Sequence, residues 1–131
     1  MLHLLTRPLP LNHTPPLDLA IYWNKITTIR GIKVYQRDDL IAPYKKDLTG
    51  RTNLQRMKAG HAPIGPDGQS VQLHHMTQRN QSSIVEVIQS FHQLNSKLIH
   101  INPNTWPSGI NRIQYNNWKQ NYWKNRAKDF Q

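Results

Sequence analysis

Cysteine is absent from the 131 residues, which excludes disulfides, thiolate nucleophiles and cysteine-based zinc sites. Any bound metal ion must therefore be held by histidine, aspartate, glutamate or asparagine. The sequence also lacks a continuous apolar run of the roughly 20 residues that a membrane-spanning helix needs, so we expect no membrane partner. Prolines at positions 8, 10, 15 and 16 interrupt the leucines of the opening segment, which argues against a cleavable signal peptide.

Acidic side chains are scarce. Seven aspartates and glutamates face 17 lysines and arginines, which gives a formal net charge of +10. A charge of this sign and size favours a polyanionic partner, because cationic side chains neutralise phosphates and the summed field attracts anions. Nucleic acid is the leading candidate, and a basic protein without a polyanionic partner is the alternative.

The length is that of one compact domain. Residues 1 to about 20 are rich in proline and leucine and show no helical or strand period, which indicates a loose arm. Residues 21–35 carry β-branched and aromatic side chains interrupted by Gly31, which is typical of a hairpin or of a helix followed by a strand. We divide the chain into a poorly ordered N-terminal arm over 1–30 and a domain over 31–131.

The middle of the domain alternates helix, turn and strand signals. Thr52 or Asn53 can cap a short helix that Gly60 ends and that presents basic side chains. The Gly-Pro-Asp-Gly sequence at 65–68 predicts a turn, followed by a strand over 71–74. Residues 84–88 resemble a mostly buried strand, with helix as the competing interpretation.

The last segment predicts an amphipathic helix. Its apolar positions at near-helical spacing are Ile110, Ile113, Trp118, Tyr122 and Trp123. Its basic side chains, expected to be largely exposed, are Arg112, Lys119, Lys124, Arg126 and Lys128. The aromatic side chains favour core packing over base stacking because they follow the helical period. Together these elements predict an α+β fold.

Four histidines between positions 74 and 100 are the candidates for chemistry. His74 and His75 are adjacent at a strand end, so their side chains leave in opposite directions and suit different roles. Imidazole binds zinc and similar ions, and it also serves as a general base near pH 7. On one straight helix His92 and His100 would stand about 12 Å apart and about 80° out of phase. A shared metal therefore requires a helix break near 94–96, where Asn95 can end a helix.

Three stretches carry a family resemblance: GRTNLQRMKAGHAPIGPDGQSVQLHHMTQRN, SFHQLNSKLIHINPNTWPSGINR and NYWKNRA. With the tripeptide Leu73-His74-His75 they resemble the LHH family of HNH/endonuclease VII nucleases over residues 33–128. The resemblance implies a small ββα-metal core, also called a His-Me finger, with additional helices. It also implies that His74, His92 and His100 bind a metal ion and that His75 activates the attacking water.

The resemblance further implies that Asn80 or Gln78 orients the base or the phosphate. One divalent metal ion is expected, zinc first, with nickel, magnesium or manganese as alternatives. The arginines in or beside the family-like motifs, which would neutralise phosphates, are Arg51, Arg56, Arg79, Arg112 and Arg126. Asn53 is assigned a capping role, and no role is assigned to His61.

Such domains occur at the tips of bacterial polymorphic toxins, so the resemblance implies a toxin used in competition between bacteria. A specialised secretion system would deliver it into the cytoplasm of a target cell, and an acidic immunity protein would neutralise it in the producer. We therefore expect a DNA endonuclease with little sequence specificity. The alternatives are a ribonuclease toxin and a non-catalytic nucleic-acid-binding domain with a structural metal held by histidines.

Overall fold

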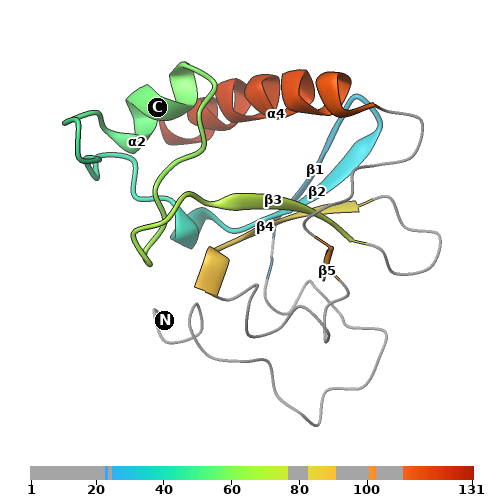
Figure 1. Cartoon of the computed structure of the whole chain (residues 1–131), viewed down its shortest axis with the longest axis horizontal. Coiled ribbons are helices and arrows are strands. Elements are labelled where there is room, and N and C mark those ends of the chain that lie inside the picture. The colour runs from blue at the N-terminus through green and yellow to red at the C-terminus, as the bar shows by residue number, and fades with distance from the viewer. Residues whose placement is uncertain (1–22, 24, 77–82, 91–100, 103–110) are drawn as a thin grey trace, which may run out of the picture.

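The computed structural model describes residue 23 and the ranges 25–76, 83–90, 101–102 and 111–131. Within these residues the chain forms one mixed sheet of strand order β1-β2-β4-β3-β5, with helices on one side (Figure 1). The strands are β1 (Lys25–Ile29), β2 (Ile32–Gln36), β3 (Gln72–Met76), β4 (Ser83–Val87) and β5 (Ile101–Asn102). The expected α+β fold is confirmed.

Strands β1 and β2 form a hairpin, which settles the choice left open for residues 21–35 over its described part, residues 25–35. Its two turn residues, Arg30 and Gly31, have φ values of 50° and 79°, as the two-residue turns that match the strand twist require. The strands pair antiparallel from Lys25 opposite Gln36. Trp23, just before the hairpin, is buried. Residue 23 and residues 25–30, which fall in the range assigned to the arm, are thus part of the folded body.

The centre of the sheet joins distant parts of the sequence. Strand β4 pairs parallel with β2 and antiparallel with β3, and every residue of β4 is buried. A strand covered on both faces explains the nearly continuous apolar run that predicted it. The strand predicted after the turn at 65–68 is also confirmed, as β3, although it begins at Gln72 and runs on to Met76.

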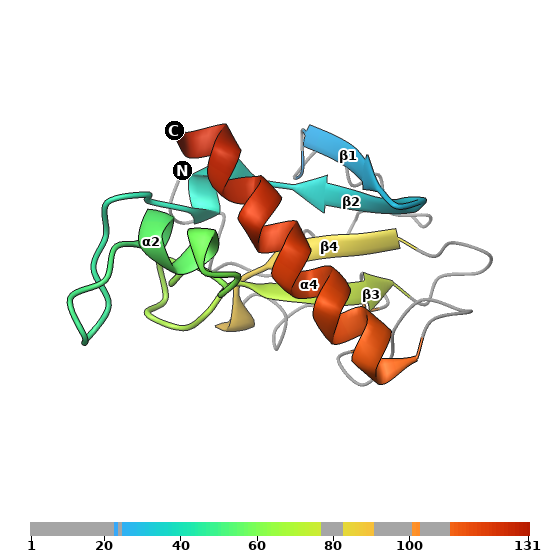
Figure 2. The same cartoon turned by 90° about the horizontal axis from the view of Figure 1, so that it is seen from above.

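Two helices cover one face of the sheet. Helix α4 (Arg112–Ala127) runs diagonally across β2, β4 and β3, and the short α2 (Asn53–Lys58) packs beside it (Figure 2). Both start with a capping box, in which the side chain of the residue before the helix and that of its third residue each accept a backbone N–H. Short 3₁₀ turns lie at η2 (Asp38–Leu40) and η3 (Lys128–Phe130).

The N-terminal signal of α2 was predicted, with one correction. Thr52 is the cap, whereas Asn53 is the first helical residue and is fully buried. The Asn53 side chain donates to the carbonyls of Ala42 and Ile64 and accepts from the Ile64 N–H, so it ties two loops together instead of capping the helix. Gly60 has φ 88° and ends the helix region as expected.

The buried face of α4 is partly as predicted. Trp118, Tyr122 and Trp123 are buried, and Trp118 stacks on Tyr122 with ring centroids 5.3 Å apart. Ile113 was expected in the core but is 73% exposed, and Tyr115 is buried instead. Ile110 lies outside the described residues. No helix in the described part of the chain is long and apolar enough to span a membrane.

Candidate active site

Strand pairing places His74 and His75 on opposite faces of the sheet. His75 lies opposite Ile84 and His74 lies opposite Val85 on β4. The side chain of Glu86 contacts α4, and Ile84 points the same way because side chains alternate along a strand. His75 therefore lies on the face covered by α4, and His74 lies on the other face. The prediction that the two side chains leave in opposite directions is confirmed.

The two histidines also differ in burial. His74 is 7% exposed, whereas His75 is half-buried. Burial lowers the pKa of His75 below its ordinary value, because the cationic form loses solvation. A neutral imidazole can accept a proton, so this position suits a general base. Close by, the Tyr115 hydroxyl donates to the Leu73 carbonyl at 3.3 Å and so fixes the first half of α4 over β3.

The predicted metal site can be compared with the structure at His74 alone. His92 and His100, the other expected ligands, lie outside the described residues, as does the expected helix break at 94–96. Among the described residues, no group of three side chains of the metal-binding kinds comes together. The donor chemistry of His74 fits the expected role, because imidazole nitrogen is a ligand for zinc, nickel and similar ions.

Strand β4, next to the histidine pair, holds a buried carboxylate. Glu86 is fully buried and accepts hydrogen bonds from Arg126 Nε at 2.9 Å and Nη2 at 3.1 Å. It also accepts from the Tyr122 hydroxyl at 2.6 Å and the Arg37 N–H at 3.0 Å. Four donors satisfy both carboxylate oxygens. Since Leu73 pairs with Glu86, this network secures the strand next to His74 and His75.

Electrostatics stabilises the network in its charged form. Burial alone would lower the pKa of Arg126, but the hydrogen bonds and charge of Glu86 raise it overall. Burial and the neighbouring Glu86 raise the pKa of Tyr122, which keeps its hydroxyl protonated as a donor. Arg126 also bonds Asp129 and Asp38, each at 2.8 Å. The guanidinium is thus shared among three carboxylates.

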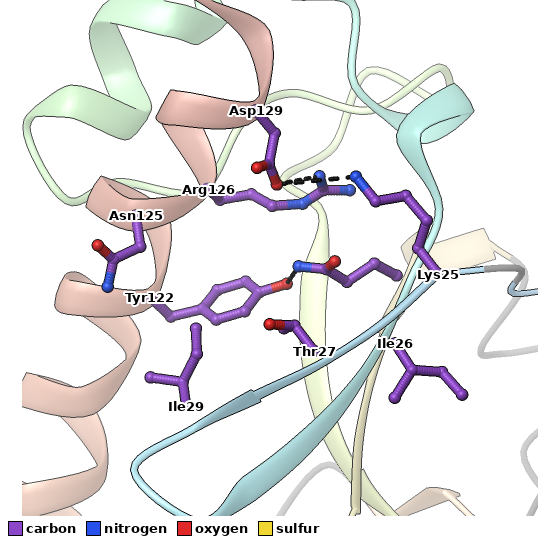
Figure 3. Close-up of a pocket in the computed structure, with 9 residues that line it drawn as sticks. Lys25, Ile26, Thr27, Ile29, Tyr122, Asn125, Arg126 and Asp129 are labelled. Carbon is purple, nitrogen blue, oxygen red and sulfur yellow. Dashed lines mark hydrogen bonds and ion pairs between the residues drawn. The ribbon is translucent and has the colours of Figure 1, made fainter.

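This network borders a cavity of about 370 Å³ between β1 and α4 (Figure 3). Lys25 and Asp129 flank one side of it, 3.9 Å apart, and the Gln36 amide donates to the Tyr122 hydroxyl at 2.8 Å. Its polar side chains bond to one another and to Glu86 and Asp38, which indicates a structural role for this cavity.

The arginines predicted to bind nucleic acid lie in different surroundings in the structure. Arg126 is buried against Glu86 and cannot reach a substrate, so that prediction is wrong. Arg56 is mostly buried and bonds Asp47 at 2.8 Å and the Ala62 carbonyl at 2.9 Å, which leaves it a structural role as well. Arg51 and Arg112 are exposed and remain candidates. Arg79, Asn80 and Gln78 lie outside the described residues.

Glu86 was not recognised from the sequence. The available signal was a single acidic residue in the apolar run of residues 84–88, because a buried carboxylate needs a partner charge. The sequence held no indication of which cation that partner would be.

A family model described as LHH, a nuclease of the HNH/ENDO VII superfamily with conserved LHH, matches residues 52–129. The match covers more than half of the chain and includes β3 with its histidine pair. The chain therefore belongs to the LHH family of nucleases, and the predicted resemblance is confirmed. No solved structure matches the chain.

The antiparallel β3–β4 pair supplies two strands of the kind that a ββα-metal core needs. Residues 89 and 90, which follow β4 after one intervening residue, are helical. Residues 91–100 lie outside the described residues, so the ββα-metal core itself remains a prediction.

Proposed function

We propose that this nuclease is a metal-dependent endonuclease that hydrolyses DNA phosphodiester bonds with little sequence specificity. The observation that carries the proposal is the histidine pair on β3, with a buried His74 and a half-buried His75 on opposite faces of the same strand. Two adjacent imidazoles in different surroundings suit two different tasks. The net charge of +10 supports a nucleic-acid substrate.

In this proposal His75 is the general base. Its imidazole removes a proton from water, the water oxygen forms a bond to phosphorus, and the leaving oxygen departs with the electrons of the broken bond. His74 is a metal ligand together with His92 and His100, and Asn80 or Gln78 orients the base or the phosphate. A bound divalent ion, zinc first among the candidates, would supply charge stabilisation at the phosphate oxygens.

We further propose that the domain acts as a bacterial toxin. A specialised secretion system would deliver it to the cytoplasm of a target cell, and an acidic immunity protein would bind it in the producer. The excess of cationic over acidic side chains supports an acidic partner, because charge complementarity speeds association and selects partners.

A plasmid-nicking assay tests the catalytic part of the proposal. Wild type, His74→Ala and His75→Ala are compared after chelation and again after addition of zinc, nickel, magnesium or manganese. His61→Ala is the matched control, because His61 is exposed and lies outside β3.

Wild type and His61→Ala should cleave DNA only after metal is restored. His75→Ala should not cleave but should still bind metal in equilibrium dialysis, whereas His74→Ala should bind it more weakly. Chelator-resistant cleavage of RNA by wild type would instead identify a ribonuclease. Metal-dependent cleavage by His75→Ala at the wild-type rate would refute the assignment of the base.

A further inference from the structure

A rigid loop over residues 42–51 lies before α2, at the far end of the sheet from the β1–β2 turn (Figure 1). Its backbone is closed by bonds from Asp47 N to the Arg51 carbonyl at 2.8 Å and from Gly50 N to the Asp47 carbonyl at 3.0 Å. The loop is tied to α2 by the bond from Asn53 N to the Lys45 carbonyl at 2.9 Å. This surface segment is therefore ordered by its own hydrogen bonds.

The Asp47 carboxylate organises the loop from inside. It accepts bonds from Thr49 N at 2.9 Å, Thr49 Oγ1 at 2.6 Å and Arg51 N at 3.0 Å, and it pairs with Arg56 at 2.8 Å. Hydrogen bonds from Thr49 and Arg56 hold the pKa of Asp47 well below its ordinary value. Its side chain is only 8% exposed. The one acidic group of the loop is thus neutralised and turned away from solvent.

Apart from Thr49, the large outward side chains of the loop are cationic or apolar. Tyr44 is 74% exposed and Leu48 is fully exposed, although both are large hydrophobic side chains. Lys45 and Lys46 are exposed, and the Arg51 side chain is 46% exposed, with its Nε 3.5 Å from Asp47 Oδ2. A single exposed apolar side chain is ordinary, but two on one rigid loop beside three cations indicate a binding surface.

The loop also borders an open pocket of about 410 Å³. Its lining consists of Lys45, Lys46, Asp47, Leu48, Thr49, Arg51, Arg56, Ile64 and Gly68. Small-molecule sites typically have volumes of about 300 to 1,000 Å³, so the pocket can accommodate one nucleotide. Its cationic side chains suit an anionic phosphate, and the exposed Tyr44 ring, which is on the same loop but not in the lining, offers a flat surface for a base.

We propose that the 42–51 loop is a second nucleic-acid contact of this nuclease, one that binds an unpaired stretch of the substrate strand away from the histidine pair. Lys46 and Arg51 bind phosphates, and the Tyr44 ring stacks on a base. Surfaces that bind single strands combine cations with exposed aromatic rings in this way. The proposal rests on the proposed nuclease function and names a surface that holds the strand without taking part in cleavage.

Fluorescence anisotropy of labelled oligonucleotides in the presence of chelator tests this surface without any cleavage. The probes are a single-stranded 20-nucleotide DNA and the duplex of the same sequence. The variants are Tyr44→Ala and Lys46→Gln/Arg51→Gln; Lys45 is kept because its Nζ donates to the Gly65 carbonyl. The charge-matched control is Lys124→Gln/Lys128→Gln, which removes two exposed cations at the C-terminal end of the chain.

Tyr44→Ala should weaken single-strand binding at least about fivefold, as loss of one stacked base predicts, and should leave duplex binding nearly unchanged. Lys46→Gln/Arg51→Gln should weaken binding of both probes. It should also flatten the salt dependence of single-strand binding by about 1.4 in log–log slope, for two phosphate contacts. The control should weaken binding less than the loop variants do.

Wild-type affinity of both loop variants for both probes would overturn the proposal and leave an acidic protein as the occupant of the loop. An equal loss for both probes on Tyr44→Ala would overturn the stacking role. Failure of the nicking assay with wild type would refute the proposed catalysis, whereas the binding results would still decide the role of the loop. Circular dichroism of each variant shows whether it is folded.

Discussion

Replacing Arg126 with methionine removes the guanidinium that compensates the buried charge of Glu86. In the variant the carboxylate keeps only the Tyr122 hydroxyl and the Arg37 N–H as donors. Removing one partner of a buried ion pair typically costs about 3–5 kcal/mol, because the remaining charge stays uncompensated in a poorly solvating interior. Domains of this kind are stable by only about 5–15 kcal/mol. The single substitution should therefore remove about a fifth or more of the folding free energy.

Urea unfolding followed by tryptophan fluorescence measures this loss, since Trp23, Trp118 and Trp123 are buried. With a slope of about 1–3 kcal/mol per molar urea, a loss of about 4 kcal/mol lowers the midpoint by about 1.3–4 M. Lys124→Met is the matched control, because Lys124 is an exposed cation of the same helix. Its effect should stay within about 0.5 kcal/mol.

A double variant separates charge from packing. In Glu86→Gln/Arg126→Met the buried charge is gone, while the amide oxygen of the new glutamine side chain still accepts a hydrogen bond. The double variant should therefore be more stable than Arg126→Met alone. The reasoning is refuted if Arg126→Met costs less than about 1 kcal/mol, or if removing the charge of Glu86 brings no recovery. Should Arg126→Met not fold, Arg126→Lys, which keeps the charge but loses the bidentate geometry, should fold with an intermediate loss.

Three further outcomes follow from the same structure. Asn53→Ala should lower the free energy of unfolding by about 2–3 kcal/mol, since it leaves the Ile64 N–H and carbonyl without their side-chain partner and removes one of the two hydrogen bonds of the Ala42 carbonyl. In urea unfolding, a loss no larger than that of an exposed site would contradict this. Thr52→Ala should lower the free energy of unfolding by about 1 kcal/mol, because the helix loses its N-terminal cap. An unchanged midpoint of urea unfolding would argue against the capping box. Because the pKa of Asp47 is lowered on folding, its contribution to stability is present above about pH 4 and is lost as the pH falls further. The free energy of unfolding of Asp47→Asn should therefore fall less than that of wild type between about pH 5 and pH 2, as measured by urea unfolding at each pH. Parallel plots of the free energy of unfolding against pH for the two proteins would exclude the role of this carboxylate.

Local sequence signals were sufficient to predict most of the secondary structure of the described residues. The cap at Thr52, the positive φ of Gly60 and the turn at 65–68 each depend on a few neighbouring residues, so the sequence shows them directly. Strands β3 and β4 were recognised by their apolar patterns for the same reason. The pairing of β2 with β4 was not predicted, because Val34 and Ile84 meet across 50 positions of sequence.

The errors concern cationic side chains whose partners the sequence does not identify. Arg126 was expected on the exposed face of α4, but its partner Glu86 lies 40 positions earlier on a strand. Arg56 was assigned to substrate, whereas Asp47 takes up its charge. The sequence shows only that a cationic side chain needs an anion or water as its partner. The fold determines which partner it contacts. The side-chain directions of the motif residues could be predicted from the sequence. His74 and His75 lie on one strand with side chains on opposite faces, as their adjacency requires.

The separation of Glu86 from Arg126 also has a consequence for biosynthesis. At about 5–20 residues per second, the 40 residues between them take about 2–8 s to synthesise. During that time the carboxylate of β4 has no guanidinium, and α4 is not yet available to cover the sheet. We therefore expect the central strands to remain unstable on the ribosome until the end of α4 emerges. A chain interrupted before Arg126 would carry the histidine motif without the fold that positions it.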